Sequence, residues 1–338
     1  MDNILLMLEK IIPEGIESFK VRYTLLQLIA ENGPIGRRSL ATLTMYSERT
    51  IRTSIDLLSK QGLIEVAHKG MMITQKGKES MDALYVTFHE SQKLMELERL
   101  LQEKLGARQV IIVPGDVDCE TRVKGQLGKA AANLLSEIIQ DHYTIAITGG
   151  STIAKVIESL VPKHKEGITV IPARGNIGKR IELQATTLAA TLADKLGGRY
   201  EMLSVPDNLN KTSIDMIKQD PHIEKTLQKM AESDMIMVGL GNALEMAVRR
   251  HEEEAVIQLL EHEGAVAEVF RYYFNSFGKV VYSTENIGID LQVAMQIPQK
   301  VIVAGGKSKA LAMLAIKNFI KQSYLIIDEG IALEMLSS

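Results

Sequence analysis

Two short glycine-rich segments carry the residue types that bind phosphate. TGGST at 148–152 follows the apolar run TIAI and precedes a helical run, and VAGGKSK at 303–309 repeats this order later in the chain. A glycine-rich turn between a strand and a helix exposes backbone N–H groups, and the helix dipole favours an anion there. Hydroxyl groups in the first segment and lysines in the second add donors. The sequence therefore predicts a phosphate crevice.

Neither segment completes a nucleotide-binding motif. The second lacks the first glycine of a Walker loop because position 301 is Val, which disfavours ATP hydrolysis. The run GLG at 239–241 begins like a dinucleotide fingerprint, but Leu244 stands where the third glycine is required. The seven histidines have no metal-ligand spacing. We expect no cofactor and no metal.

Further polar side chains stand near other predicted strand ends. Arg174 follows ITVIP, Gln184 is on the next helix, Arg249 and Arg250 end a helix after MIMVGLG, and Glu268 lies in GAVAEVFRYYFN. A guanidinium group binds phosphate oxygens in a bidentate manner, and a carboxylate accepts hydrogen bonds from sugar hydroxyls. Each residue taken singly fits a surface charge or a packing role better than a binding role. Their shared position at strand ends makes them binding candidates.

The elements that must position these residues begin at about position 109. Short apolar runs alternate there with helical segments: QVIIVP, TIAIT, ITVIP, MIMVGL, KVIVAGG and YLIID. Nearly continuous apolar strands between helices indicate a buried parallel sheet with helices on both faces. Ligands of such Rossmann-like α/β sheets bind outside the carboxyl ends of the strands. The predicted fold class is thus a doubly wound α/β domain over 106–338.

The first 77 residues predict a winged helix-turn-helix. Helices are expected over 16–31, 37–44 and 47–60, followed by a two-stranded wing around Lys69 and Gly70. An apolar stripe on the third helix leaves a polar face that fits a DNA major groove. The predicted DNA contacts are Arg37, Arg38, Ser47, Glu48, Arg49, Thr50, Arg52, Thr53 and Lys69. The alternative is a winged helix that makes only protein contacts.

Charge is divided unequally along the chain. From Lys20 to Lys78 there are ten Lys and Arg against four Asp and Glu, although the whole chain has a net charge of −3. A basic module on an acidic body is expected when one end alone contacts nucleic acid. The N-terminal run MDNILLMLEK lacks the positive charge of a signal peptide, and the chain has one cysteine. We expect a cytoplasmic protein without a membrane anchor.

A long helix is expected over 78–105, between the two domains. Leu94, Leu97, Leu101 and Leu105 recur three and four residues apart. This stripe fits either a dimerising linker or a helix that packs on its own domain.

Taken together, these blocks resemble the SorC family of sugar-responsive transcriptional regulators, in particular its repressors of central glycolytic genes. The resemblance runs along nearly the whole chain and is carried by GPIGRRSL (33–40), TGGST (148–152), PARG (172–175), EVFRYYFN (268–275), VAGGKSKA (303–310) and DEG (328–330). It implies an effector domain like phosphosugar isomerases and deaminases, fructose-1,6-bisphosphate as effector, and a dimer or tetramer on operator DNA.

By position, the resemblance implies the following effector contacts: Gly149, Gly150, Ser151, Thr152, Arg174, Gln184, Arg249, Arg250, Glu268 and Lys309. Ser151 replaces the Thr expected in the family but keeps the hydroxyl. Lys307 and Arg271 stand where small residues are expected, so we expect them to add positive charge near the phosphate loops.

The prediction is a repressor, not an enzyme, whose operator binding is modulated by fructose-1,6-bisphosphate. Ser151, Thr152 and Lys309 would hold one phosphate. The second phosphate or the bridging contacts would fall to Arg174, Gln184, Arg249 and Arg250, and Glu268 would hold hydroxyl groups. One alternative is an isomerase or deaminase with a DNA-binding appendage, although no acid/base partner for Glu268 is evident. Another is a regulator that senses a different sugar or polyol.

Overall fold

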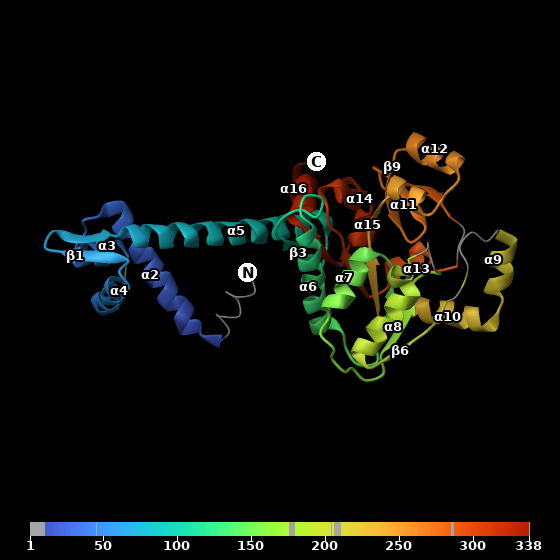
Figure 1. Cartoon of the computed structure of the whole chain (residues 1–338), viewed down its shortest axis with the longest axis horizontal. Helices are drawn as coiled ribbons and strands as arrows, with labels where there is room; N and C mark the ends of the chain where they lie inside the picture. Colours follow the sequence, from blue (N-terminus) through green and yellow to red (C-terminus); the bar gives the residue numbers. More distant parts are fainter. Residues whose placement is uncertain are drawn as a thin grey trace. The chain divides into compact units, whose positions relative to one another are not determined.

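The computed structural model describes residues 11–44, 46–175, 180–203, 205, 211–284 and 287–337, without the side chains of 16 and 82–92. All predicted effector and DNA contacts lie within these ranges. The chain folds into two compact units, Met1–Met95 and Glu96–Ser338 (Figure 1). None of the described helices combines the length and apolar character that a bilayer span requires.

The N-terminal unit is a winged helix-turn-helix, as predicted. Its elements are α2 (Pro13–Asn32), α3 (Arg37–Leu43), α4 (Glu48–Lys60), β1 (Ile64–Ala67) and β2 (Gly70–Ile73). The two strands pair antiparallel, with Ala67 opposite Gly70, so that Lys69 lies in the tip of the wing. Apolar side chains from all three helices and both strands form its core, including Leu25, Leu40, Ile51, Ile55, Ile64 and Met71.

Helix α5 (Gln75–Leu105) begins three residues earlier than the helix expected over 78–105. Leu97, Leu101 and Leu105 are buried within the single chain, which agrees with the interpretation that this part of the helix packs on its own body. Two hydrogen bonds hold it there. Glu98 Oε1 accepts from the backbone N–H of Ile112 at 2.7 Å, and Lys104 Nζ donates to the Met335 carbonyl at 2.7 Å. These leucines are therefore not exposed as a dimerising seam.

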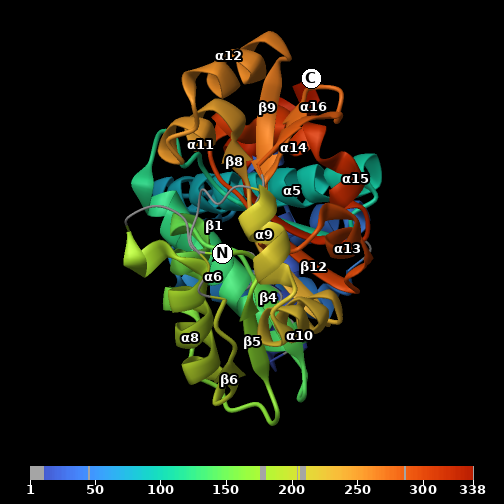
Figure 2. The same ribbon diagram turned by 90° about the vertical axis from the view of Figure 1, so that its right-hand side faces the viewer.

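The second unit is built on a seven-stranded sheet in which every pairing is parallel, in the order β3-β13-β12-β7-β4-β5-β6 (Figure 2). Six strands match the predicted apolar runs: β3 (Gln109–Val113), β4 (Thr144–Ile147), β5 (Thr169–Pro172), β7 (Met235–Gly239), β12 (Gln299–Val303) and β13 (Tyr324–Asp328). The edge strand β6 (Arg199–Tyr200) is two residues long and was not predicted. The predicted doubly wound α/β fold is confirmed.

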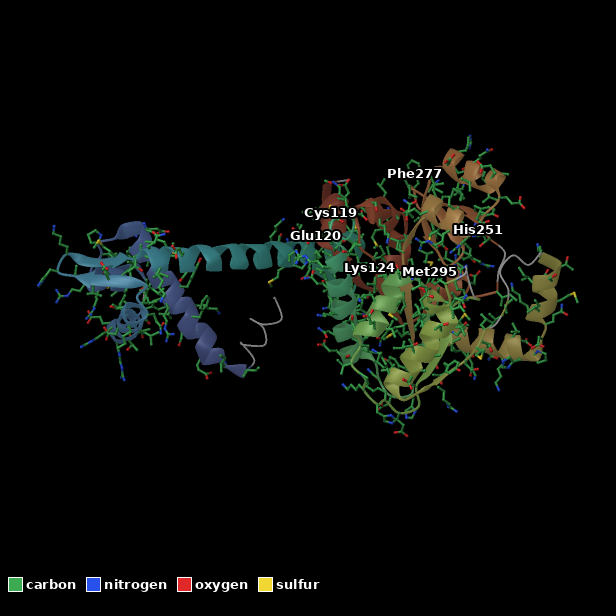
Figure 3. The ribbon with its side chains drawn as sticks, in the orientation of Figure 1. Cys119, Glu120, Lys124, His251, Phe277 and Met295 are labelled. Atoms are coloured by element: carbon green, nitrogen blue, oxygen red, sulfur yellow. The ribbon has the colours of Figure 1, made fainter. Side chains whose placement is uncertain are left out.

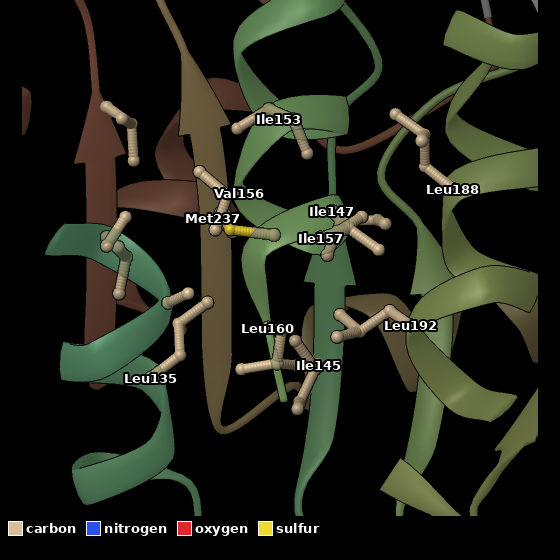
Figure 4. Close-up of a cluster of buried hydrophobic side chains, with 14 of the residues drawn as sticks. Leu135, Ile145, Ile147, Ile153, Val156, Ile157, Leu160, Leu188, Leu192 and Met237 are labelled. Carbon is tan, nitrogen blue, oxygen red and sulfur yellow. The ribbon is translucent and has the colours of Figure 1, made fainter. Parts of the chain in front are cut away.

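Helices α6 (Thr121–Ile138), α7 (Ser151–Ser159) and α8 (Ala185–Leu196) bury their apolar stripes against this sheet (Figure 4). Leu135, Ile157 and Leu192 are at most 1% exposed and pack with Ile145 and Met237 of the strands. The remaining helices of this unit are α9 (Lys211–Lys218), α10 (Pro221–Ala231), α13 (Leu291–Gln296), α14 (Ala310–Ala315), α15 (Lys317–Ile320) and α16 (Glu329–Ser337).

A second, antiparallel sheet was not predicted. It has the order β11-β10-β9-β8, formed by β8 (Gly241–Asn242), β9 (Ala265–Val269), β10 (Tyr272–Asn275) and β11 (Val280–Ser283). Helices α11 (Ala243–Arg249) and α12 (Glu254–His262) pack on it around the fully buried Tyr273. Because β8 follows β7 directly, this subdomain stands over the carboxyl ends of the large sheet, and it carries Glu268 and the arginines that end α11.

Candidate functional site

A pocket of about 530 Å³ lies at the carboxyl ends of β4, β5, β7 and β12. All ten predicted effector contacts line it, although they come from six separate segments of the chain: Gly149, Gly150, Ser151, Thr152, Arg174, Gln184, Arg249, Arg250, Glu268 and Lys309. The strands that end here were predicted to meet at one edge of the sheet, and the added subdomain supplies the opposite wall with Arg249, Arg250 and Glu268.

The loop after β4 presents the start of α7 to this pocket. Helix α7 begins at Ser151, and its N-cap Gly150 offers no side chain to the free N–H groups of the first turn. Gly150 has a φ of 111°, which disfavours any residue with a side chain. A Cβ on Gly149 would lie 2.5 Å from the Leu183 carbonyl oxygen. Both glycines are thus needed to bring this helix end, with its donors, to the pocket wall.

The loop after β12 is held by three aspartates. Gly306 N–H donates to Asp328 Oδ2 at 2.6 Å, while the N–H groups of Lys307 and Ser308 donate to Asp116 and Asp118 at 3.2 and 2.8 Å. Asp328 is fully buried and also accepts from two further N–H groups, those of Val117 and Ile331. This bracing fixes the short helical turn that places Lys309 at the pocket. It also gives a structural reason for the DEG run at 328–330.

A buried ion cluster forms the far end of the pocket. Glu268 Oε1 accepts from Arg250 Nη2 at 2.5 Å and lies 3.8 Å from Arg174 Nη1. The exposed fractions of these side chains are only 6 to 8%. Both arginines also donate to the carbonyl oxygen of Phe270. Burial lowers the pKa of Arg250, but the charge and hydrogen bond of Glu268, with Tyr273 and Glu252, together outweigh burial, so the net shift is upward.

The carbonyl of Phe270 reaches the two arginines because its backbone has a left-handed conformation, with a φ of 61°. This conformation is uncommon for a bulky residue. The side chain compensates by packing edge-to-face on Phe319, with 5.6 Å between ring centroids, and it is 4% exposed. In the turn between β9 and β10, the Phe270 carbonyl thus binds the two pocket arginines, and the Phe270 ring packs in the core.

Several pocket residues were missed from the sequence. Lys124 on α6 donates to Ser151 Oγ at 2.6 Å, and Arg180, Glu245 and His251 also line the cavity. Burial and the positive charges of Lys309, Arg249 and Arg180 lower the pKa of Lys124. None of these residues belongs to a glycine-rich motif. The position of Lys124 depends on the packing of α6 against α7, which no local pattern reveals.

Two residues expected to add charge near the loops do not line the pocket. Lys307 Nζ forms an ion pair with Glu334 at 3.0 Å, which raises its pKa, and Arg271 lies 3.6 Å from Asp290. The expectation that both side chains supply positive charge at this site was therefore wrong. Their charges are balanced by local carboxylates.

The N-terminal unit presents the predicted DNA contacts on its surface. Ser47 caps α4 by accepting from the Thr50 N–H at 3.1 Å. The buried face of α4 consists of Ile51, Ser54, Ile55 and Leu58. The exposed contacts are Arg37, Arg38, Ser47, Glu48, Arg49, Thr50, Arg52, Thr53 and Lys69. The N-terminal end of the third helix thus displays donors in the manner of a recognition helix, next to a wing tipped by a lysine.

Within the described part of the chain, Arg37 is the one member of this set in an ion pair. It lies 3.7 Å from Asp56, and both side chains are about half exposed. Such an exposed pair contributes little stability and leaves the arginine accessible.

Within the described residues, no group of three or more His, Cys, Asp and Glu is arranged to hold a metal ion.

Two protein-family models match the chain, and the boundary between them lies close to the boundary between its two compact units. Residues 19–88 match the CggR N-terminal DNA binding domain, and residues 89–337 match the sugar-binding domain model Sugar-bind. Two curated relatives match over the full chain. The central glycolytic genes regulators of Bacillus subtilis and Priestia megaterium are each 34% identical, over 99% of this chain and 99% of their own length.

Solved structures agree with this likeness. A SorC family transcriptional regulator from Enterococcus faecalis is 35% identical, with a TM-score of 0.65 over 71% of this chain and 99% of that one. The full-length sorbitol operon regulator of Klebsiella pneumoniae is 16% identical, with a TM-score of 0.66 over 95% of this chain and 99% of that one. The second match shows a shared fold only.

Proposed function

This chain belongs to the family of the central glycolytic genes regulators, and from that membership we propose that it represses glycolytic genes under the control of fructose-1,6-bisphosphate. It is a DNA-binding transcriptional regulator with a sugar-binding domain, and its relatives are named as regulators, not as enzymes. The isomerase or deaminase alternative is therefore set aside. Our proposal concerns the identity of the effector, the regulated genes and the oligomeric assembly.

The charge balance of the pocket is the observation that carries the effector assignment. Among the described residues, six cationic side chains line it against two carboxylates: Lys124, Arg174, Arg180, Arg249, Arg250 and Lys309 against Glu245 and Glu268. Because Arg180 also pairs with Glu182 at 2.7 Å, three positive charges remain without a carboxylate. A phosphate group carries about −1.5 to −2 charges at neutral pH, so two phosphates match this excess. A monophosphate or an uncharged polyol would leave partly buried cations without counter-charge.

We divide the lining residues between two proposed phosphate subsites. The first surrounds the loop after β4 and includes Ser151, Thr152 and Lys309. Arg249 belongs with it, because its positive charge lowers the pKa of Lys309, in addition to the larger effect of burial. The second group is Arg174 and Arg250, joined by Glu268. This assignment moves Arg249 from the second phosphate to the first.

In the second subsite, Glu268 would hold a sugar hydroxyl and Gln184, at the N-cap of α8, would contribute an amide. Glu268 already accepts from Arg250, so a hydroxyl would use a remaining lone pair of the carboxylate. The arginines would then bind the phosphate through donors directed away from Glu268. The proposal thus keeps the ion cluster intact when the effector is bound.

We extend the proposal to domains and assembly. Residues 1–77 read the operator, 78–105 form a linker helix, and 106–338 bind the effector and form the contacts of a dimer or tetramer. Helix-turn-helix dimers contact two half-sites one helical turn apart, so a paired operator is expected. The effector shifts DNA binding only if it binds one assembly more tightly than the other. The site of action is cytoplasmic.

The test uses the purified full chain and DNA from upstream of its own gene. Calorimetric titration is made with fructose-1,6-bisphosphate, fructose-6-phosphate and fructose, and a gel shift is repeated with each sugar. We expect binding of the bisphosphate in preference to the others, and a change in the gel shift with the bisphosphate alone. If the calorimeter shows no heat of bisphosphate binding, the effector assignment is wrong. A response to fructose alone favours a regulator of a different sugar.

A further inference from the structure

Lys124 is a pocket residue for which the proposed function has no assigned task. It lies in the first turns of α6, is half-buried, and faces the pocket beside α7 (Figure 3). Its Nζ donates to Ser151 Oγ at 2.6 Å, although 27 residues separate them in the sequence. A lysine is thus held directly against the first helical residue of the loop after β4.

The backbone that carries Lys124 is firmly placed. Its neighbours Val123 and Leu127 are fully buried in the core of the sheet, and a Cβ on Gly128 would lie 2.6 Å from the Lys155 carbonyl oxygen of α7. Helices α6 and α7 therefore approach closely at this point. Lys124 reaches the pocket by virtue of core packing, so the side chain does not depend on a flexible loop.

The segment before α6 also holds the second phosphate-binding loop. Asp116 and Asp118 precede α6 and accept from the backbone N–H groups of Lys307 and Ser308. Lys124 and Lys309 are consequently fixed relative to each other through one short stretch of chain. Both line the pocket together with the loop after β4.

The charged groups that act on Lys124 are cations. Within the described part of the chain, no ion pair is formed between its Nζ and a carboxylate, and the charges that shift its pKa are all positive: Lys309, Arg249 and Arg180. Holding a half-buried cation beside other cations costs free energy in the protein alone. A bound anion removes this cost, which is the behaviour expected of a ligand-binding group.

We infer that Lys124 is a direct ligand of the effector phosphate that binds at the loop after β4, and that it also orients the hydroxyl of Ser151. The inference rests on the proposed function, since it takes the ligand to be a sugar phosphate. While Nζ donates to Ser151 Oγ, the hydroxyl hydrogen is free to point away from the lysine, toward the anion. The other Nζ hydrogens bond to a phosphate oxygen.

The experiment compares Lys124→Gln with Lys129→Gln, an exposed lysine on the same helix. Fructose-1,6-bisphosphate affinity is measured by calorimetry for the full chain, and thermal unfolding is followed without ligand. A charge-assisted bond to phosphate predicts an affinity loss of about tenfold or more for Lys124→Gln. Lys129→Gln should bind like the wild type, and Lys124→Arg should recover most of the loss.

Thermal unfolding separates binding from a structural role. The unfolding temperature of ligand-free Lys124→Gln should be equal to or above that of the wild type, since the substitution relieves repulsion. An unchanged affinity in Lys124→Gln, with normal binding by the wild type, overturns the role of Lys124 alone. So does a lowered unfolding temperature that Lys124→Arg restores without restoring affinity. Absence of binding in the wild type overturns the proposed effector and this inference together.

Discussion

Arg250 Nη2 lies 2.5 Å from Glu268 Oε1, and this buried pair forms one wall of a pocket that is otherwise rich in positive charge. The same carboxylate faces Arg174 at 3.8 Å. The pocket therefore has a carboxylate buried against two arginines at one end, whereas at the other end the lining cations outnumber the one lining carboxylate, Glu245. The two ends should respond differently to substitution.

Replacing Glu268 by Gln should destabilise the effector unit. The substitution leaves two nearly buried guanidinium groups without a counter-charge, and breaking such a cluster costs about 3–5 kcal/mol. Urea denaturation followed by circular dichroism measures the loss. Glu261→Gln, an exposed carboxylate on α12, is the matched control and should change the free energy of unfolding by less than about 0.5 kcal/mol. If Glu268→Gln lowers effector affinity but leaves the free energy of unfolding unchanged, Glu268 contributes to ligand binding and not to stability.

Replacing Asp328 by Asn should release the loop that carries Lys309. The carboxylate accepts from three backbone N–H groups through its two oxygens, and an amide group must present a donor to at least one of them. An unsatisfied buried donor costs about 1–3 kcal/mol. We expect lower stability and weaker bisphosphate binding, by denaturation and calorimetry. Asp194→Asn on the exposed face of α8 should alter neither quantity. Wild-type affinity in Asp328→Asn would show that the brace is dispensable.

Replacing Arg49 or Arg52 by Ala should weaken operator binding without changing effector binding. Both side chains are exposed at the N-terminal half of α4. A base contact predicts a loss of about 1–3 kcal/mol that depends on operator sequence, whereas a phosphate contact predicts a uniform loss and a salt slope reduced by about one. Fluorescence anisotropy at several salt concentrations distinguishes them. Lys60→Ala, in the last turn, should have a smaller effect, and equal losses for all three would argue against a recognition helix.

Effector affinity should decline in mildly alkaline solution. Burial lowers the pKa of Lys309, and burial with neighbouring cations lowers that of Lys124, from an ordinary value of about 10.4. Below these lowered pKa values both lysines are charged and bind phosphate fully. As pH rises through them, protons are lost and affinity falls. The groups that shift Lys309 besides burial are Glu245, Asp118 and Asp328, which raise its pKa, and Arg249, which lowers it.

Calorimetry at pH values from about 7.5 to 10 measures this decline, against the ordinary lysine pKa of about 10.4. Lys309→Arg keeps its charge over the whole range and should move the decline to higher pH. A flat profile for the wild type would mean that neither lysine carries binding energy.

Much of the fold was predictable because its signals are local. The six apolar runs became strands of one parallel sheet, and Ser47 caps α4 as its position before the helix predicts. The antiparallel sheet was not predictable in the same way. Its strand β8 has two residues, and its pairing depends on contacts between segments far apart in the chain.

The pocket residues in local motifs could also be predicted from the sequence, whereas those positioned by packing between distant segments could not. Residues in the glycine-rich loop after β4, such as Ser151 and Thr152, could be placed at the pocket from local pattern, because a glycine-rich turn before a helix is visible in the sequence. Lys124 was missed because its role depends on how α6 packs on α7. The grouping of Arg249 with Lys309 and of Arg250 with Glu268 was also beyond the sequence, because neighbouring residues at a helix end point in different directions.

Arg249 and Arg250 stand next to each other in the chain, yet the proposed function assigns them to the two phosphate subsites of the pocket. Consecutive Cα atoms are separated by about 3.8 Å, so the spacing between the two ends cannot vary freely. The proposed function therefore predicts that this pair helps to select ligands by the separation of their anionic groups. A ligand with a single anionic group would contact one of the two arginines. A ligand with an anionic group at each end, at a matching distance, would contact both.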